Sequence, residues 1–224
     1  MDFSFVEGYA SNFYKGFFIT LEISIIAVVG AVLFGTLIYF MKGINFHIGK
    51  IYPIRLIINV FIEIMRGTPV LLQILIAYSG SKMLLNLNVS PFAAATFAIM
   101  LNSSVYVAEI IRGGIESIPV GQMEAARSLG MTKVQGMFKV VVPQAIKNIL
   151  PPIGNEFVGI IKSSSMASTI GVAELTFSAK IVQGATYLSM EPLIVAGVYY
   201  FVLTFVLGRL MQYIERRMKA SDLR

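Results

Sequence analysis

The chain has 224 residues, of which 56% are hydrophobic and 13% are charged, and its mean hydropathy is +0.77. This composition excludes a soluble globular domain and predicts an integral membrane domain of about five helical spans, each needing roughly 20 apolar residues. The chain contains no cysteine, which excludes disulfides, thiolate metal sites and cysteine nucleophiles.

Five apolar runs follow one another along the chain. Asp2 and Glu7 precede the first run, where a secretory signal would carry positive charge, so no cleaved signal is expected. The sequence therefore predicts an all-α integral membrane protein with one domain, residues 1–224, whose core extends from about residue 16 to 213. The predicted spans are residues 17–41, 54–78, 91–111, 151–172 and 192–213.

Positive charge is distributed unequally between the segments that join these runs. The outer segments carry only Lys15, Lys82 and Lys180, whereas the inner segments carry thirteen Lys and Arg residues. Because basic residues are retained on the cytoplasmic side, the N-terminus is predicted outside and the C-terminus in the cytoplasm. The net charge of +6 therefore reflects membrane topology and excludes nucleic acid as a partner. The inner cations are Lys42, Lys50, Arg55, Arg112, Arg127, Lys133, Lys139, Lys147, Arg209, Arg216, Arg217, Lys219 and Arg224.

Small residues recur every four positions in the first and third runs. Small side chains at this spacing let two helices approach closely in lipid, where hydrophobicity no longer drives helix association. Both series are therefore interpreted as packing faces. The two series are Ala27, Ala31 and Gly35, and Ala94, Ala98 and Asn102.

Ionisable and polar residues within the runs have two interpretations, and both remain open. Glu63 with Arg66, and Glu109 with Arg112, are spaced for local ion pairs, or they belong to an inner gate of a transport pathway. The fourth run carries polar residues that line a water-filled cavity, or else its lysine pairs with its acid and its serines bond back to the helix. These residues are Asn155, Glu156, Lys162, Ser163, Ser164 and Ser165.

A polar, basic segment, residues 112–150, separates the third and fourth runs. Pro119 can open a helix, and Gly130 lies where a left-handed helix stop is needed. Thr132 then begins a Thr-x-x-Gln capping box, and Pro143 is expected to end the second helix. The segment is therefore predicted to form an elbow of two short helices joined at Gly130, which either presents a surface to a partner or only stiffens a loop.

Each helix of this elbow has an apolar side. The predicted faces are Val120, Met123, Ala126 and Leu129 in the first helix, and Val134, Met137, Phe138 and Val141 in the second.

The sequence does not support catalysis by this chain. His47 is the only histidine, so no zinc cluster and no serine triad can be assembled. The segment Gly43 to Ile51 is a poor match to a phosphate loop, because five residues separate its glycines and Ile51 replaces the Ser or Thr that would bind Mg²⁺. If ATP drives this protein, another chain must bind it.

The string Glu124-Ala-Ala, followed by Gly130 and Val142-Pro143, resembles the cytoplasmic "EAA" loop of permease subunits in ATP-binding-cassette (ABC) importers. Three further strings are similar to the polar amino acid branch of that family, and the match extends from about Gly16 to Tyr213. A departure is Ser163-Ser164-Ser165-Met166, which is not the family's commonest form. The strings are Arg66-Gly-Thr-Pro-Val-Leu-Leu-Gln73, Tyr106-Val-Ala-Glu-Ile-Ile-Arg-Gly-Gly114, and Pro143-Gln-Ala followed by Lys162-Ser-Ser-Ser165.

The resemblance implies a type I ABC importer permease for a polar amino acid, in the cytoplasmic membrane of a prokaryote. It implies a second permease copy or paralogue, two ATPase subunits that hold ATP and Mg²⁺, and an extracytoplasmic substrate-binding protein. This chain would bind no cofactor and would not be an enzyme. The alternatives are a secondary amino acid transporter, which would show repeats and ion-coupling acids, and a membrane scaffold without a transport role.

Within this interpretation, residues 112–150 form the coupling loop. The coupling residues are Val120, Gln122, Met123, Glu124, Ala125, Ala126, Leu129 and Gly130. The pathway candidates are Glu109, Asn155, Glu156, Lys162, Ser163, Ser164 and Ser165, and the candidates for an inner gate or ion pairs are Glu63, Arg66 and Arg112.

Overall fold

The computed structural model describes residues 1–49 and 51–220, so Lys50 and Arg224, counted above among the inner cations, lie outside the described residues. Within these ranges the protein is helical, and the only β-type pairing is an isolated bridge between Ile48 and Ile51. The elements are α1 (Phe5–Lys42), α2 (Pro53–Gly67), α3 (Val70–Leu85), α4 (Pro91–Glu116), α5 (Val120–Ser128), α6 (Lys133–Gly136), the π-helical turn η1 (Met137–Val141), α7 (Val142–Ser163), the 3₁₀ helix η2 (Ser164–Ile170), α8 (Leu175–Thr186) and α9 (Glu191–Ala220).

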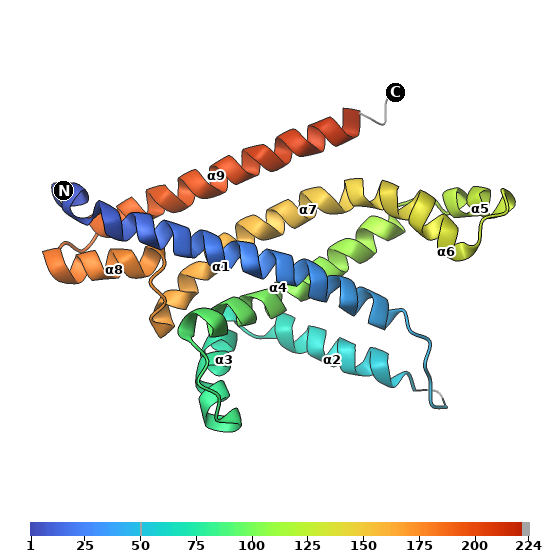
Figure 1. Cartoon of the computed structure of the whole chain (residues 1–224), viewed down its shortest axis with the longest axis horizontal. Helices are drawn as coiled ribbons and strands as arrows, with labels where there is room; N and C mark the ends of the chain where they lie inside the picture. Colours follow the sequence, from blue (N-terminus) through green and yellow to red (C-terminus); the bar gives the residue numbers. More distant parts are fainter. Residues whose placement is uncertain (50, 221–224) are drawn as a thin grey trace.

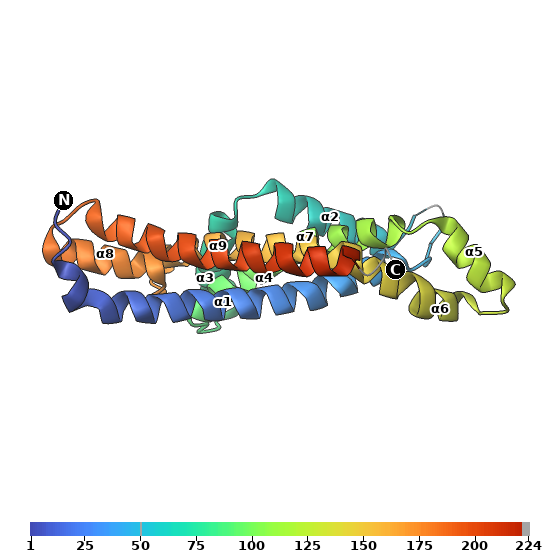
Figure 2. The same ribbon diagram turned by 90° about the horizontal axis from the view of Figure 1, so that it is seen from above.

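The long helices α1, α4, α7 and α9 run lengthwise through the molecule (Figure 1). The N-terminus and α8 lie at one end, and the α5–α6 elbow lies at the opposite end, as the view from above also shows (Figure 2). This arrangement places the elbow beyond the ends of the long helices, on the side opposite the N-terminus, and the sidedness of the membrane remains a prediction.

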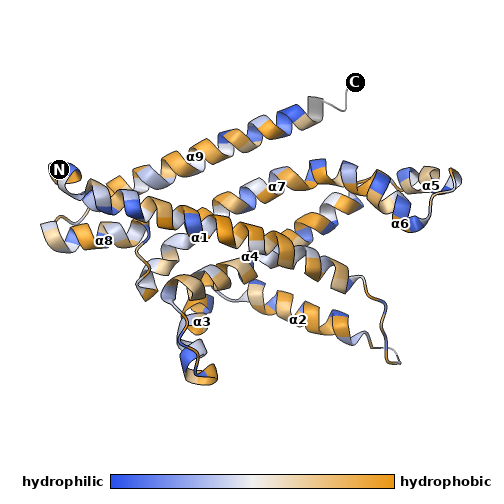
Figure 3. Ribbon diagram, in the orientation of Figure 1, coloured by the Kyte–Doolittle hydropathy of each residue, from blue (hydrophilic) through white to orange (hydrophobic). Residues whose placement is uncertain are grey.

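The long helices expose large apolar side chains. Figure 3 shows hydrophobic residues along most of α1 and α9, where a soluble protein would present polar groups. α1, α4 and α9 are each long and apolar enough to cross a membrane, and the bent pair α2–α3 makes a fourth candidate. The protein is thus a multi-pass membrane protein, whereas the five-span count and the orientation of the termini remain predictions.

Two predicted spans have other boundaries in the structure. The second is not a continuous helix, because α2 and α3 meet at an angle of 110°. Pro69 lacks an N–H and forces the preceding Thr68 into an extended conformation (φ −119°, ψ 146°), which ends α2. The fourth span was expected to begin at residue 151, but α7 already begins at Val142 and passes through Pro151 and Pro152.

The small residues of α1 and α4 pack these two helices against each other, which confirms the predicted packing faces. Ala27 and Ala31 of α1 are fully buried, and Ala94 and Ala98 of α4 are at most 4% exposed. At Gly35 the backbones are so close that a methyl group would lie 2.7 Å from the carbonyl oxygen of Ser104. Such close contact supplies the van der Waals attraction that holds helices together in lipid.

This contact predicts that Gly35→Ala destabilises the protein by about 1–3 kcal/mol, because the added methyl group has no space without moving backbone. Gly8→Ala on the same helix is the matched control, since nothing lies within 4 Å of a methyl group there. We expect Gly8→Ala to cause no loss of stability, because alanine has a higher helix propensity than glycine. Thermal unfolding of both variants in one detergent tests this, and equal midpoints would contradict the proposed close packing.

Candidate functional site: a helical elbow and a polar helix

The elbow has the predicted local geometry. α5 follows Pro119, and Gly130 adopts a left-handed conformation with φ +84° between the two helices. Thr132 forms the predicted capping box: its hydroxyl accepts from the Gln135 N–H at 3.2 Å, and the Gln135 side chain accepts from the Thr132 N–H at 2.9 Å. The interpretation as two helices joined at Gly130 is confirmed.

The expected end of the second helix at Pro143 is wrong. α6 is only one turn long and continues through the π-helical turn η1 into α7. Pro143 lies in the first turn of α7, where a missing N–H and a fixed φ are tolerated. As a result, the second part of the elbow is continuous with a long helix of the bundle.

The apolar residues of the elbow divide into two groups, so neither helix presents all of its predicted face outward. Met123 of α5 packs toward Gly136 of α6, where an added methyl group would lie 2.8 Å from the Met123 sulfur, and Ala126 is buried in the same contact. In contrast, Val120 is 74% exposed and Leu129 is 81% exposed. Val134 and Phe138 also lie open on the surface, as do the coupling candidates Glu124 and Ala125.

Side-chain hydrogen bonds attach the elbow to the bundle. Gln122 of α5 accepts from the Gln144 amide of α7 at 3.1 Å, so this coupling candidate links α5 to α7. Asn148 of α7 donates to the Ser117 hydroxyl at the end of α4 at 2.8 Å. Because both bonds connect to α7, the elbow and that helix are expected to move together.

The C-terminal end of α4 carries a cluster of charges. Arg112 contacts Glu109 at 2.7 Å and Glu116 at 2.6 Å, and Lys42 of α1 lies 3.7 Å from Glu109. The predicted Glu109–Arg112 ion pair is therefore present.

The second predicted ion pair is absent among the described residues. Glu63 and Arg66 are both exposed on α2 and do not contact each other. Arg66 instead contributes to the positive potential around Glu109. The helical spacing allows an ion pair, but Arg66 lies in the last turn before the helix break, where the orientation of its side chain depends on the tertiary structure.

Two amide side chains donate hydrogen bonds to backbone carbonyl groups at the break between α2 and α3. Gln73 donates to the carbonyl oxygens of Met65 (3.0 Å) and Thr68 (3.2 Å) and to the Thr68 hydroxyl (2.8 Å). Asn102 of α4 donates to the same Met65 carbonyl at 3.0 Å and to the Gln73 side chain at 3.1 Å. Backbone groups freed by a broken helix are thus paired, as a lipid environment requires. Sequence analysis assigned Asn102 only to packing and did not give Gln73 this role.

The serines that follow Lys162 bond mainly to the helix that carries them. Ser164 is fully buried and donates to the Ile161 carbonyl, and Ser165 donates to the Lys162 carbonyl. Ser163 is half-buried. Of the two interpretations, back-bonding thus applies to Ser164 and Ser165.

Other polar residues of α7 remain accessible. Asn155 and Lys162 are exposed, and no ion pair joins Lys162 to Glu156 in the part of the chain that the structure describes. Glu156 is half-buried, with the Ser103 hydroxyl of α4 within hydrogen-bonding range. A hollow of about 330 Å³ is lined by Lys162, Ser165, Thr176, Leu193, Ala196, Gly197 and Tyr200.

A buried carboxylate near this hollow was not predicted. Glu174 is fully buried and caps α8 by accepting from the N–H groups of Thr176 (2.9 Å) and Phe177 (2.8 Å). The Tyr200 hydroxyl of α9 donates to the same carboxylate, and Thr20 of α1 accepts from the N–H of the next residue, Leu175. The acid thus joins α8 to α9, and the neighbouring Leu175 N–H adds a bond to α1. The sequence did contain a signal for this site, because an acidic residue within an apolar stretch, as found after Gly171, usually has a specific partner.

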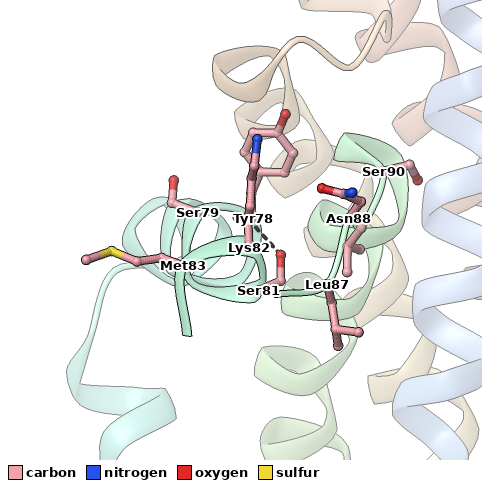
Figure 4. Close-up of a pocket in the computed structure, with 9 residues that line it drawn as sticks. Tyr78, Ser79, Ser81, Lys82, Met83, Leu87, Asn88 and Ser90 are labelled. Carbon is pink, nitrogen blue, oxygen red and sulfur yellow. Dashed lines mark hydrogen bonds between the residues drawn. The ribbon is translucent and has the colours of Figure 1, made fainter. Parts of the chain in front are cut away.

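A second hollow, of about 540 Å³, lies where α3 ends and the chain turns back toward α4 (Figure 4). Tyr78, Ser81 and Lys82 come from α3, and Asn88 and Ser90 from the following loop. The hollow contains none of the predicted site residues, and Ser81 already donates to the Tyr78 carbonyl.

The fold and the elbow together define a class of protein: the membrane-spanning subunit of a type I ABC importer. Residues 43–220 match the family described as "Binding-protein-dependent transport system inner membrane component", and the chain belongs to this family. Members of this family are transport subunits and not enzymes, because the ATPase is a separate subunit.

Two transport permeases align with nearly the whole chain. The arginine transport system permease protein ArtQ of Bacillus subtilis is 36% identical over 99% of both chains. The glutamine transport system permease protein GlnP of Escherichia coli K12 is 35% identical over 92% of both.

Chains from two solved ABC transporter structures have a similar fold. A chain from a structure titled "Crystal structure of an amino acid ABC transporter with histidines" has a TM-score of 0.89 at 45% identity, covering 97% of this chain and 99% of that one. A chain of the MetNI methionine ABC transporter has a TM-score of 0.76 at 16% identity, and this likeness concerns the fold alone.

The left-handed turn of the elbow gives a second prediction. We expect Gly130→Ala to cost about 1–2 kcal/mol of local stability, because a side chain is strained at φ +84° even though nothing lies within 4 Å of it. Gly121→Ala on α5 also adds a methyl group in open space, but at a helical φ, and is expected to be neutral or stabilising. Hydrogen exchange over residues 119–141 measures the difference. Equal protection in the two variants would show that the turn does not need its left-handed residue.

Proposed function

We propose that this chain is the permease subunit of an ATP-driven importer that carries a polar amino acid across the cytoplasmic membrane of a prokaryote. The observation that carries the proposal is the elbow: a membrane protein exposes apolar side chains on a polar, rigidly braced segment outside its spans. The substrate class is supported by relatives named for arginine and glutamine transport.

In the proposed assembly, two permease subunits, either copies of this chain or this chain and a paralogue, form the pathway. Two ATPase subunits hold ATP and Mg²⁺ and dock on the two elbows, where Val120, Leu129 and Phe138 supply apolar contact and Glu124 a polar one. An extracytoplasmic binding protein delivers the amino acid at the opposite end. The distribution of Lys and Arg supports this orientation, with the elbow inside the cell.

The proposed mechanism couples two sites through rigid elements. When ATP closes the ATPase pair, the docked elbow moves, and α7 moves with it because η1 and the Gln122–Gln144 bond connect them. α7 packs against α4 and α9, so its displacement changes the opening between the spans. ATP binding and substrate access are then linked as two global states of one assembly.

The polar side of α7 is the proposed substrate pathway. An amino acid brings a carboxylate and an ammonium group, and each needs a partner in a medium of low dielectric constant. Lys162 suits the carboxylate, and Glu156 suits the ammonium group, with Asn155, Ser163 and Ser165 as hydrogen-bonding neighbours. Ser164 is left out of the pathway because it is fully buried. Glu109 is assigned to the inner charge cluster, where Arg112 and Lys42 contact it.

One experiment separates the importer from a secondary transporter and from a scaffold. The chain is co-expressed with its candidate ATPase and reconstituted in vesicles. ATP hydrolysis that a loaded binding protein stimulates, together with ATP-dependent uptake of an amino acid, is expected only of the importer. Uptake driven by an ion gradient without the ATPase would overturn the proposal.

The third prediction concerns Glu124. Glu124→Lys should lower stimulated ATP hydrolysis about tenfold or more, because an unfavourable interface charge costs at least about 1.4 kcal/mol. The subunit should remain folded and inserted, since Glu124 is exposed and surface changes usually alter stability by no more than about 0.5 kcal/mol. Glu7→Lys, an equally exposed reversal at the opposite end, is the control. Loss of the Glu124→Lys protein from the membrane would assign Glu124 a structural role.

The fourth prediction uses the absence of native cysteine. Single cysteines at Asn155, Lys162 and Ser165 should react with a small water-soluble thiol reagent, and substrate should protect them. A cysteine at Ser164 should stay unreactive because that position is fully buried. Uniform lack of reaction at the first three positions would show that this side of α7 is covered by another helix, and the pathway assignment would be dropped.

A further inference from the structure

The loop between α1 and α2 is folded into a small hairpin. Ile48 and Ile51 exchange two backbone hydrogen bonds of 2.9 and 3.1 Å, and Gly49 (φ +62°) permits the tight turn between them. The rings of His47 and Tyr52 meet edge to face, 5.7 Å apart. The loop therefore has a defined shape that presents the same side chains together.

The hairpin exposes apolar side chains. Among its described apolar side chains the most exposed is Ile48, at 66%, and the same apolar surface continues onto the first turns of α2, where Ile57 is 69% exposed. No described element packs on this surface. The apolar surface consists of Ile44, Phe46, Ile48, Ile51, Tyr52, Leu56, Ile57 and Val60.

Positive charge accompanies this surface. No Asp or Glu occurs between Glu22 and Glu63, and Arg55 lies beside the hairpin. The charge of Lys42 is paired with Glu109 of α4 at 3.7 Å, so Arg55 supplies the positive charge of this surface. Arg55 is held in place: it donates to the Lys42 carbonyl at 3.0 Å and to the Asn45 side chain at 2.6 Å, and its guanidinium lies 4.8 Å from the centre of the Tyr52 ring.

A surface that is both apolar and cationic, at the end of two membrane helices, matches the headgroup boundary of a bilayer that contains anionic lipid. We propose that the described part of the hairpin, residues 43–49 with Ile51 and Tyr52, is an interfacial anchor that binds anionic phospholipid in the cytoplasmic leaflet. Phe46, Ile48 and Ile51 enter the boundary with the acyl chains, and Arg55 faces the headgroups. The choice of leaflet rests on the proposed orientation, but the anchoring does not.

Spin labels on single cysteines measure depth in the bilayer, and this cysteine-free chain needs no prior substitution. The chain with Ile48→Cys is reconstituted in vesicles of phosphatidylcholine containing phosphatidylglycerol. We expect its label to be accessible to oxygen and shielded from a water-soluble nickel complex. Gly121→Cys, exposed on α5 at the same end of the molecule, should give the reverse pattern. Equal exposure of both labels to nickel would overturn the proposal.

The role of charge is tested with Arg55. We expect Arg55→Gln to lower the preference for phosphatidylglycerol over phosphatidylcholine about fivefold, the effect of one cation near an anionic surface. Spin-labelled lipids measure this preference. Arg55→Lys keeps the charge but alters the donors to Lys42 and Asn45, and it should retain the preference. An unchanged preference in Arg55→Gln, or its loss in both variants, would contradict binding by charge.

Adding the ATPase distinguishes this proposal from the proposed function. Shielding of position 48 only in the presence of ATPase would make the hairpin part of that interface and overturn lipid anchoring. A label at position 121 that stays exposed with ATPase present would instead contradict docking on the elbow. An impermeant thiol reagent that reaches position 121 from outside intact cells would reverse the orientation and leave the anchoring intact.

Discussion

The structure depends on one constraint: a backbone donor or acceptor inside a bilayer needs a partner within the protein. The helix breaks are where this is hardest to satisfy, and polar side chains are concentrated there. Gln73 and Asn102 pair the carbonyl groups freed between α2 and α3. Glu174 caps α8 with two N–H bonds, and the hydroxyls of η2 bond back to their own helix. Much of the polarity in this apolar chain therefore maintains the backbone.

This constraint also explains why the bundle can act as a set of rigid parts. Unbroken helices are joined by contacts of small residues, such as the approach of Gly35 of α1 to Ser104 of α4. Broken ones are held by specific hydrogen bonds. The elbow shares these properties, because its capping box, the Gln122–Gln144 bond and the continuous η1 turn leave it little freedom relative to α7. A movement imposed at the elbow thus reaches the membrane without loss in a flexible joint.

The two ends of the bundle have different surfaces. At one end, Val120, Leu129 and Phe138 stand out from a polar elbow, as a protein partner requires. The nearby hairpin combines Ile48 and Ile51 with Arg55, as a lipid boundary requires. At the opposite end the buried Glu174 joins α8 to α9, and the next residue, Leu175, bonds to Thr20 of α1. If the hairpin is anchored as proposed, a fixed depth at that end and a rigid unit at the other would both favour a movement concentrated in the central helices.

The sequence alone determined the membrane class, the family, the close packing of Ala27 and Ala31, and the turn at Gly130, because each of these depends on composition or on residues near one another in the chain. The break at Pro69 has a local cause in the sequence, but the 110° angle that follows it, the continuity of η1 with α7 through Pro143 and the absence of a Glu63–Arg66 ion pair among the described residues depend on the tertiary structure. The functions of Gln73, Asn102 and Glu174 have the same origin. A polar residue in an apolar run shows that a partner exists, but only the tertiary structure decides whether that partner is water, a substrate or an unpaired backbone group.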